Sequence, residues 1–437
     1  MDTDVIVIGA GASGLAAAAH LAQRSLRVVV LEARDRIGGR VLWTDGTDGR
    51  ESVELGAEFI HGRAPETMAL LRRAGVSAVS LDRDSWTRGD DGVLTLDEAD
   101  FRAATDVFDG ARNLKADESV DRYLRRFERD PSMAEKVVLA RAFVEGFEAA
   151  DPSDASVVAI ADELGSGVDY ATHRPAGGYR RLFDELHETC VKAGVTIELS
   201  AVVNTVRWRR GDVTIDVSIG SVRRTLRAKA VVVTVPVGVL KRSGEAASFD
   251  PVLPAVKRSA LDKIVMGHVV KVVLRFRSPF WERLSDGRYG GAGFFRCPQG
   301  RFPAYWTQRP QPGDSVVAWA GGTDASALSG FRESELIDIA LDEFSGLFGH
   351  PRAAREEFLD GVMHDWSSDP FAWGAYSYVV VDGHGARATL GSPVEGTLFF
   401  AGEATSTDGQ GGTVNGAIST GERAAREAEA VLEAEAL

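Results

Sequence analysis

Hydrophobic and polar positions at the start of the chain alternate between strand-like and helix-like patterns. Residues 4–9 form a short apolar run, residues 12–23 are rich in alanine with helical spacing, and residues 28–32 form a second apolar run that ends in an acid. Two buried strands separated by a helix are typical of a βαβ unit with parallel strands. The first forty residues are therefore predicted to open an α/β domain.

The remaining chain changes pattern in blocks. Residues 65–168 are rich in helix formers with helical spacing and are predicted to be helical, and the aromatic residues Phe143 and Phe147 are interpreted as core. β-branched residues alternate with polar ones in several later segments, which are predicted to be strands. These segments are residues 196–199, 202–206, 213–217, 229–236 and 267–281. An alanine-rich helix is predicted at the end of the chain.

Length and composition narrow the class of protein. A chain of 437 residues is too long for one core, and 44% hydrophobic residues with 47 glycines fit a folded α/β protein. The net charge of −14 argues against a nucleic-acid partner and is compatible with cationic ligands, although acidity for solubility explains it equally well. Only Cys190 and Cys297 are present, so a disulfide framework is not expected.

Targeting signals are not expected either. The first predicted strand begins four residues from the initial methionine, which leaves no room for a signal peptide. The longest apolar run, at residues 228–240, is too short to span a bilayer. We therefore predict a cytoplasmic protein without a membrane partner, and either a monomer or a homodimer.

Three glycines follow the first strand with the spacing GxGxxG. Gly9 permits a tight turn, Gly11 lets the backbone approach a diphosphate, and Gly14 allows close packing of helix and strand. Free N–H groups at the helix start, where Ser13 lies, favour negative charge. Glu32 ends the second strand, where a carboxylate can accept hydrogen bonds from a ribose. A dinucleotide site is predicted here, in preference to a simple turn.

A second glycine pair and three arginines follow in the segment EARDRIGGR, residues 32–40. This block resembles the second cofactor-contact segment of the flavin amine oxidases, the family of monoamine oxidases, polyamine oxidases and lysine-specific histone demethylases. The resemblance implies FAD as cofactor. It also implies that Glu32, Arg34, Gly39 and Arg40 contact its adenosine and diphosphate.

The segment ELGAEFIHG, residues 54–62, is similar to a family segment that passes beside the flavin. The small residues Gly56 and Ala57 are expected to contact the ring. His61 matches a position that meets the substrate amine in polyamine oxidases, and a structural histidine near a glycine turn is the alternative. Glu58 could add negative charge for the substrate, or it could brace the loop.

Lys271 lies inside an apolar strand, where a charged side chain must be paired or face a wet cavity. An edge-strand lysine is the simplest interpretation from the residues alone. The surrounding block, KVVLRF followed by PFW, resembles the family strand whose lysine holds a water against flavin N5. The resemblance therefore implies a catalytic role for Lys271.

Residues 364–378 resemble the WxxDPxxxGxYSY segment of the polyamine oxidase branch. This resemblance places Trp366 at the cofactor and Tyr376 in the aromatic cage that binds the amine. Ala375 stands where monoamine oxidases carry the cysteine that binds flavin covalently. The FAD is therefore expected to be bound without a covalent link.

The last family block spans residues 396–417 and ends in a helix start. The resemblance implies that Gly402, Glu403, Thr413 and Val414 contact the cofactor, and that the backbone of Val203, far upstream, contacts the adenine. Thr413 also stands where monoamine oxidases have a second cage tyrosine. This departure leaves the cage half open and favours longer aliphatic amines.

Together the blocks imply an α/β fold: a Rossmann-type FAD-binding domain with an interleaved α+β substrate-binding domain. The FAD-binding part is expected at residues 1–62, 175–240 and 386–437, and the substrate part at residues 63–174 and 241–385. No metal-ligand cluster is recognised.

The implied reaction passes a hydride equivalent from the α-carbon of an aliphatic amine or polyamine to flavin N5. Imine hydrolysis follows, and oxygen then takes up the electrons to give hydrogen peroxide. A flavin amine or amino-acid dehydrogenase or desaturase with a different electron acceptor is the first alternative. A flavin-holding interaction protein is the second alternative.

Overall fold

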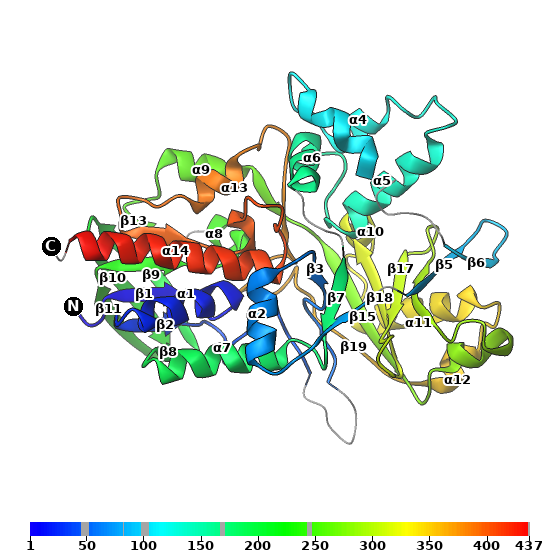
Figure 1. Cartoon of the computed structure of the whole chain (residues 1–437), viewed down its shortest axis with the longest axis horizontal. Helices are drawn as coiled ribbons and strands as arrows, with labels where there is room; N and C mark the ends of the chain where they lie inside the picture. The colour runs from blue at the N-terminus through cyan, green and yellow to red at the C-terminus, as the bar shows by residue number, and fades with distance from the viewer. Residues whose placement is uncertain (45–51, 82, 98–104, 167–170, 243–246, 436–437) are drawn as a thin grey trace.

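Both ends of the chain lie at the same end of the molecule, beside a parallel sheet, and a larger sheet occupies the opposite end (Figure 1). The computed structural model describes residues 1–44, 52–81, 83–97, 105–166, 171–242 and 247–435. Among these residues, no helix is both long enough and apolar enough to cross a bilayer.

The parallel sheet has five strands in the order β21-β12-β1-β2-β8, and every neighbouring pair is parallel. Its strands are β1 (Val5–Ile8), β2 (Val28–Leu31), β8 (Thr196–Glu198), β12 (Ala230–Val233) and β21 (Leu398–Phe400). The chain leaves this sheet and returns to it, so segments from its start, middle and end pair side by side. The predicted α/β class is confirmed.

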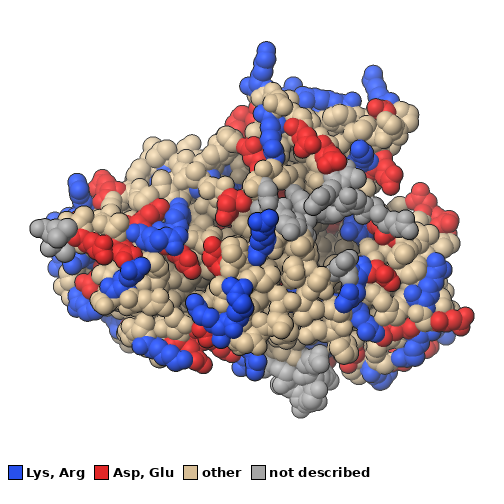
Figure 2. All heavy atoms as spheres, viewed as in Figure 1, with Lys and Arg blue, Asp and Glu red and all other residues tan. Residues whose placement is uncertain are grey.

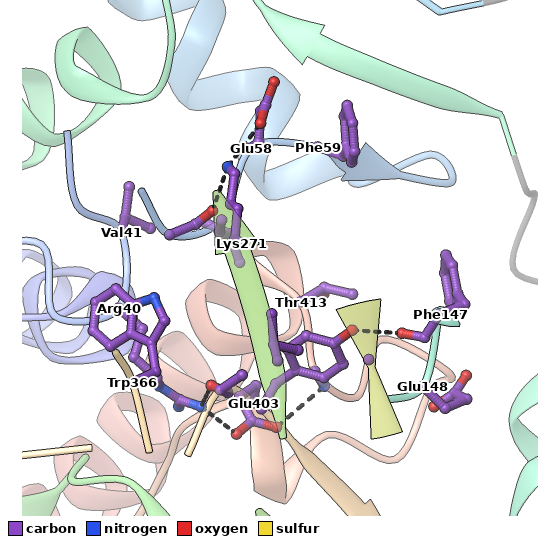
Figure 3. Close-up of a pocket in the computed structure, with 18 of the residues that line it drawn as sticks. Arg40, Val41, Glu58, Phe59, Phe147, Glu148, Lys271, Trp366, Glu403 and Thr413 are labelled. Carbon is purple, nitrogen blue, oxygen red and sulfur yellow. Dashed lines mark hydrogen bonds and ion pairs between the residues drawn. The ribbon is translucent and has the colours of Figure 1, made fainter. Parts of the chain in front are cut away.

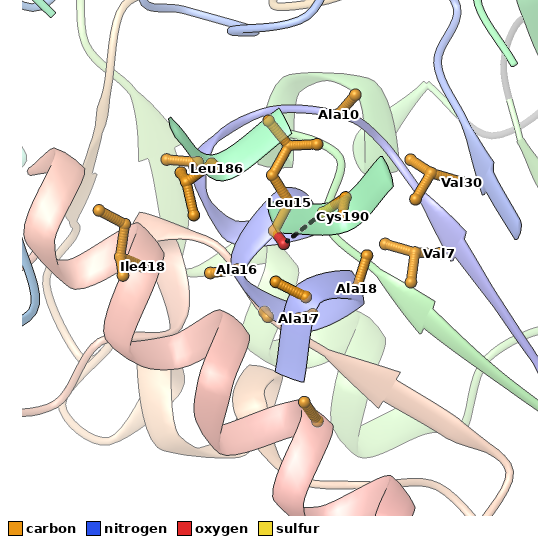
Figure 4. Close-up of a cluster of buried hydrophobic side chains, with 14 of the residues drawn as sticks. Val7, Ala10, Leu15, Ala16, Ala17, Ala18, Val30, Leu186, Cys190 and Ile418 are labelled. Atoms are coloured by element: carbon orange, nitrogen blue, oxygen red, sulfur yellow. Dashed lines mark hydrogen bonds between the residues drawn. The ribbon is translucent and has the colours of Figure 1, made fainter. Parts of the chain in front are cut away.

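Helices cover one face of the parallel sheet. They are α1 (Ala12–Gln23), α2 (Pro65–Arg73), α7 (Arg180–Lys192) and α14 (Val414–Ala434). The central helix α1 is mostly alanine, and these small side chains let α7 and α14 pack closely on both sides of it (Figure 4). Cys190 of α7 donates its Sγ hydrogen to the carbonyl of Leu15, at 3.4 Å.

A second sheet covers the opposite face, with strand order β11-β10-β9-β13. Its strands are β9 (Ala201–Arg209), β10 (Asp212–Ile219), β11 (Val222–Ala228) and β13 (Ser248–Asp250). Alternate residues of β9 and β10, including Val206, Ile215 and Val217, are fully buried against Ile6 and Val231 of the parallel sheet. The parallel sheet is therefore buried on both faces, which explains its continuous apolar runs.

The opposite end of the molecule is built on a seven-stranded sheet in the order β19-β15-β18-β17-β16-β5-β6. The strands are β5 (Asp84–Arg88), β6 (Leu94–Leu96), β15 (Val269–Phe276), β16 (Ala292–Arg296), β17 (Ala304–Thr307), β18 (Ser315–Gly321) and β19 (Phe358–Met363). Helix α11 (Glu333–Leu347) packs an aromatic core, centred on Phe344, against one face. The other face points back toward the parallel sheet.

Shorter elements complete the molecule. Two small sheets have the orders β3-β7-β4 and β14-β20; their strands are β3 (Ile60–His61), β4 (Ala78–Ser80), β7 (Thr172–Pro175), β14 (Ile264–Met266) and β20 (Ser377–Val379). A helical lobe contains η1 (Asp106–Asn113), α4 (Val120–Leu124), α5 (Ala134–Gly146) and α6 (Val157–Gly165). The other helical elements are α8 (Val237–Lys241), α9 (Ala255–Asp262), η2 (Phe280–Gly287), α10 (Gly322–Ala327), α12 (Ala353–Glu357), α13 (Ala386–Gly391) and η3 (Glu403–Thr405).

Most predicted strands are confirmed, and residues 65–73 are helical as predicted, but the prediction of one helical stretch over residues 65–168 is wrong between residues 78 and 96. Residues 78–80, 84–88 and 94–96 form strands. The strand at 84–88 pairs with β16 and the strand at 94–96 pairs with β5, so both extend the seven-stranded sheet. Within the predicted stretch, helix α4 is short, Val120–Leu124, and most of residues 125–132 are exposed. The predicted end of the stretch, residue 168, lies outside the described residues. The division into two domains at the predicted boundaries stays a prediction.

Lys257 of α9 is buried without a carboxylate partner among the described residues, and it holds the end of α13 instead. Its Nζ donates hydrogen bonds to the carbonyls of Thr389 and Leu390, both at 2.7 Å, and to that of Ser392. The ammonium also lies 4.5 Å from the ring centre of Phe400. One side chain therefore satisfies carbonyls that a helix end leaves unpaired.

We expect Lys257→Met to lower the free energy of unfolding by about 2–4 kcal/mol, because three carbonyls at the end of α13 lose their donor. Urea unfolding of the holoprotein followed by circular dichroism measures this. Lys263→Met is the matched control, because Lys263 Nζ donates to a single carbonyl, that of Val381, at 3.0 Å. Equal losses in the two variants would contradict this interpretation.

Candidate active site

A cavity of about 1170 Å³ runs between the parallel sheet and the seven-stranded sheet. Its wall includes the start of α1, the ends of β1 and β2, the start of α14, and residues of β15, β17 and β18. Every residue that the sequence singled out for the site lines this cavity except Gly14, which lies beneath the turn. Segments from the whole length of the chain therefore contribute to one site.

The glycine-rich turn provides a cradle at one end of the cavity. Gly9 adopts a φ of +108°, and a Cβ on Gly14 would lie 1.9 Å from the Gly9 carbonyl oxygen. The start of α1 has no side-chain cap, so its N–H groups are available to a ligand. The buried Ser13 Oγ has no hydrogen-bond partner in the described structure. An unpaired donor at an uncapped helix start fits a diphosphate.

Glu32 lies at the end of β2 and braces this cradle. One carboxylate oxygen accepts a hydrogen bond from the Ala10 amide at 2.7 Å, and the other accepts from the Arg34 amide at 2.9 Å. Each oxygen keeps a further lone pair for a ribose hydroxyl. Val203 of β9 lies in the wall of the same cavity.

Arg34 was predicted to contact the adenosine, and the structure gives it a protein partner. Its guanidinium makes a bidentate pair with Asp369, with both distances 2.8 Å, and lies 5.3 Å from the ring centre of Phe371. Burial acts to raise the pKa of Asp369, but His364 and Arg34 together hold it well below its ordinary value. The adenosine contact of Arg34 stays a prediction.

Arg40, which is partly buried, and the buried Glu403 form a second ion pair in the cavity wall, at 2.9 Å (Figure 3). Glu403 also accepts hydrogen bonds from Ser377 Oγ at 2.7 Å and from the Gly412 amide at 3.1 Å. Burial acts to raise the pKa of Glu403, but Arg40 and Arg387 hold it below its ordinary value. The carboxylate therefore stays charged and fixes the loop before α14.

Lys271 reaches the cavity from the centre of β15, between β18 and β19, so the alternative of an edge-strand lysine is wrong. Its Nζ donates to Glu58 at 2.7 Å and to the Gly56 carbonyl at 3.0 Å (Figure 3). Trp306 Nε1 donates to both carboxylate oxygens of Glu58. The oxygen that does not contact Lys271, Oε1, also pairs with Arg174 at 2.8 Å. Ala57 lies between these partners in the cavity wall. The substrate role of Glu58 stays a prediction.

Tyr376 and Thr413 lie on the side of the cavity that leads to α14. The Tyr376 hydroxyl donates to the Phe147 carbonyl at 2.7 Å, which fixes the ring in the wall (Figure 3). Thr413 caps α14, since its Oγ1 accepts from the Gly416 amide at 2.9 Å, and Val414 follows as the first helical residue. Trp366 completes this wall and donates to the Leu55 carbonyl at 3.0 Å.

His61 lies in the cavity wall opposite β15, and its ring packs edge-on against Phe147 with centroids 4.8 Å apart. Burial lowers the pKa of His61 to about 4, so the imidazole is neutral near pH 7. A neutral imidazole can accept a hydrogen bond from an amine, whereas an imidazolium would repel a cationic one. Both interpretations of His61 given above stay open.

Several residues of this site were missed at the sequence level. Phe147 was interpreted as core, and it does pack on the core of the helical lobe beside Phe143, but its ring also lines the cavity next to His61. Arg174, Trp306 and Glu148 had no recognised motif. For Glu148, an acid next to an aromatic residue at a helix end was the available signal, and it is too common to single out.

The uncapped helix start, the spare lone pairs of Glu32 and the large cavity beside them fit a dinucleotide-binding protein with room for a second ligand. A sequence model described as flavin containing amine oxidoreductase matches residues 12–428, nearly the whole chain. The chain therefore belongs to the flavin-containing amine oxidoreductase family. The predicted family is confirmed.

Relatives in this family include two kinds of enzyme. The chain is 30% identical to lysine-specific histone demethylase 1 homolog 2 of Arabidopsis thaliana over 445 residues, covering 96% of this chain and 58% of that protein. It is 30% identical to polyamine oxidase 4 of Oryza sativa subsp. japonica over 453 residues, covering 97% of this chain and 88% of that protein. The chain thus spans little more than half of that demethylase homologue.

Solved structures show the same fold. A putrescine oxidase bound to putrescine superposes with a TM-score of 0.82 at 24% identity, covering 98% of this chain and 99% of that one. Cyclohexylamine oxidase from Brevibacterium oxydans IH-35A gives a TM-score of 0.79 at 22% identity, with full coverage of both chains. The cofactor is FAD without a covalent link, and the glycine cradle, Ser13 and Glu32 fit it.

We expect Gly14→Ala to weaken FAD binding about 100-fold, because the added Cβ would displace the turn that carries the cradle. Titration of the FAD-free protein, followed by flavin fluorescence, measures the affinity. Gly346→Ala is the matched control, since a Cβ at Gly346 of α11 meets nothing within 4 Å. An unchanged affinity in Gly14→Ala would place the diphosphate elsewhere.

Proposed function

We propose that this chain is an FAD-dependent amine oxidase that acts on an aliphatic amine or a polyamine. The observation that carries the proposal is the continuity of one cavity, which extends from the cradle at Gly9 to a chamber walled by Lys271, Tyr376 and Glu148. The cradle takes the cofactor diphosphate, and the chamber takes the amine. The names of the polyamine oxidase and putrescine oxidase relatives support the same substrate class.

Bound FAD supplies a two-electron acceptor for a hydride equivalent from the amine α-carbon, after which the substrate imine is hydrolysed. The residues of the chain bind the amine substrate and orient it. The phenol ring of Tyr376 is held by its hydrogen bond to Phe147 and offers its face to an alkyl amine. Thr413 lies on the same side of the cavity as this ring, and its short side chain leaves room beside the ring for a long aliphatic chain.

Protonation of the substrate controls the reaction in this scheme. A hydride can leave only when the nitrogen lone pair is free, and alkyl amines are ordinarily protonated below about pH 10. His61 is neutral above about pH 4, so it adds no positive charge to the chamber. We propose that oxygen reoxidises the cofactor and that hydrogen peroxide is released. The cytoplasmic location and the state as monomer or homodimer stay predictions.

An anaerobic panel of amines tests the function. Aliphatic diamines or polyamines are expected to bleach the oxidised-flavin band near about 450 nm, and the reduction rate is expected to rise between about pH 6 and 10 because more substrate is neutral. Peroxide yield per turnover, measured in air, separates an oxidase from a dehydrogenase or desaturase. A flavin that no amine bleaches would refute the proposal.

Glu148 supports a substrate with a second cationic group. Its carboxyl lines the cavity beyond Phe147 and makes no side-chain hydrogen bond or ion pair with the described residues (Figure 3). Burial, together with the nearby Glu163, raises its pKa to about 8, although Arg387 acts to lower it. Burial also raises the pKa of Glu145 and Asp324 in the same wall. Carboxyls of this kind ionise readily once a cation lies beside them.

We expect Glu148→Gln to raise the KM for a diamine about tenfold, equivalent to about 1.4 kcal/mol, and to leave the KM for a monoamine of equal length nearly unchanged. The preference of the wild type for the diamine should grow as pH rises through about 8, where Glu148 ionises in the free protein. Steady-state kinetics across this range measures both effects.

Glu343→Gln is the control for this experiment, because it removes one carboxylate charge on α11, outside the cavity. Equal losses for both amines in Glu148→Gln would place the second cation elsewhere.

A further inference from the structure

The carboxylate of Glu58 is the centre of a buried cluster at the cavity wall. Its Oε2 accepts from Lys271 Nζ at 2.7 Å, and its Oε1 pairs with Arg174 Nη2 at 2.8 Å. Trp306 Nε1 donates to both oxygens, at 3.1 and 3.2 Å. All four side chains are almost completely buried. Such geometry satisfies a buried carboxylate from three directions.

Each cation is also held from outside the cluster. Arg174, on β7, donates to the carbonyls of Thr307 and Gln308 at 3.3 and 3.2 Å. Lys271 Nζ donates to the Gly56 carbonyl at 3.0 Å. Among the described residues, Lys271 therefore directs two of its three N–H groups into the protein, and the third is available to the cavity that it lines.

The cluster carries one positive charge more than its carboxylate compensates. Burial opposes the ionisation of Glu58, but Lys271 and Arg174 hold its pKa below the ordinary value, so it is ionised. Glu54 is a second buried carboxyl close enough to act on all three charges. Its Oε1 accepts from the Tyr179 amide at 2.7 Å, and its Oε2 has no hydrogen-bond partner in the described structure.

Glu54 changes the charge of this cluster near neutral pH. Burial raises its pKa to about 7; Lys271 and Arg174 act to lower it, and Glu58 acts to raise it. Two other titratable groups of this region do not titrate there, because burial raises the pKa of the Tyr179 phenol far above 7 and lowers that of His61 to about 4. The net charge is therefore +1 when Glu54 is protonated and zero when it is ionised.

We infer that Glu58 is a positioning residue for Lys271, and that Glu58 and Glu54 together set the net charge that Lys271 presents to the cavity. This inference rests on the proposed function. A buried charge at the wall acts strongly on electron transfer in the cavity, because the surroundings screen it weakly. A cluster that only braced the fold would affect stability and leave the pH dependence of the cavity unchanged.

The test uses the FAD-loaded protein reduced by light, with oxalate as the electron donor and no amine present, so it gives a result even if no amine is a substrate. Reoxidation on mixing with oxygen and the visible spectrum of oxidised FAD are followed from about pH 5.5 to 9. In the wild type we expect the reoxidation rate and the visible spectrum to change together in one step near pH 7. Reoxidation should be about tenfold faster at pH values below this step. Glu54→Gln should abolish the step.

Variants of the two neighbours should move the step in opposite directions. Glu58→Gln leaves Glu54 facing two cations without a competing carboxylate, so the step moves to lower pH. Lys271→Met removes a cation, so the step moves to higher pH. Glu58→Asp keeps the charge and should return the step toward pH 7, and Glu343→Gln should behave as the wild type.

A step at the same pH in Glu58→Gln, Lys271→Met and the wild type would overturn the inference, as would a step that survives in Glu54→Gln. If Glu58→Gln fails to fold, Lys271→Met and Glu54→Gln decide between the same outcomes. Failure of every amine to bleach the flavin would refute the proposed function alone, because reduction by light does not depend on it.

Discussion

Two arginines near the start of the chain hold together segments that lie 335 and 363 residues apart in sequence. Arg34 pairs with Asp369 and Arg40 pairs with Glu403, and both pairs lie at the cavity. A buried pair is costly to form and more costly to break, because a single remaining charge would lack compensation. The fold can therefore close only with these segments in register, and that register also brings the start of α14 and the Tyr376 ring against the cavity.

The same principle shapes the rest of the cavity wall. On the face shown in Figure 2, acidic and basic side chains are interspersed over the surface. Inside, each buried carboxylate near the cofactor has assigned partners: backbone amides for Glu32, arginine and serine for Glu403, and two cations for Glu58. Glu148 departs from this rule, because the described residues give its carboxyl no hydrogen bond or ion pair. Among the described residues, Glu32 and Glu403 near the cradle therefore have partners, whereas the Glu148 carboxyl in the chamber has none.

Local physics made part of this structure predictable. The GxGxxG turn, the alanine-rich α1 and the apolar strands β1, β2 and β12 follow from spacing and side-chain size, and all were predicted. Residues 84–96 escaped prediction because their pairing partner, β16, lies about two hundred residues further on. Arg174 and Trp306 were missed for a similar reason, since their value depends on meeting Glu58 in space. The family resemblance predicted that Lys271 lies in the site. Its carboxylate partner, Glu58, became apparent only from the three-dimensional structure.

Helix α14 lies against the very turn that opens the chain. Gly421 packs so closely on α1 that a Cβ there would lie 2.2 Å from the Ser13 carbonyl oxygen, and β21 forms the outer edge of the parallel sheet. During synthesis, the nucleotide cradle at the first βαβ unit is therefore supported only after α14 has been made. Cofactor capture becomes a late event in biogenesis, and a growing chain released early would carry a recognisable motif without a finished pocket.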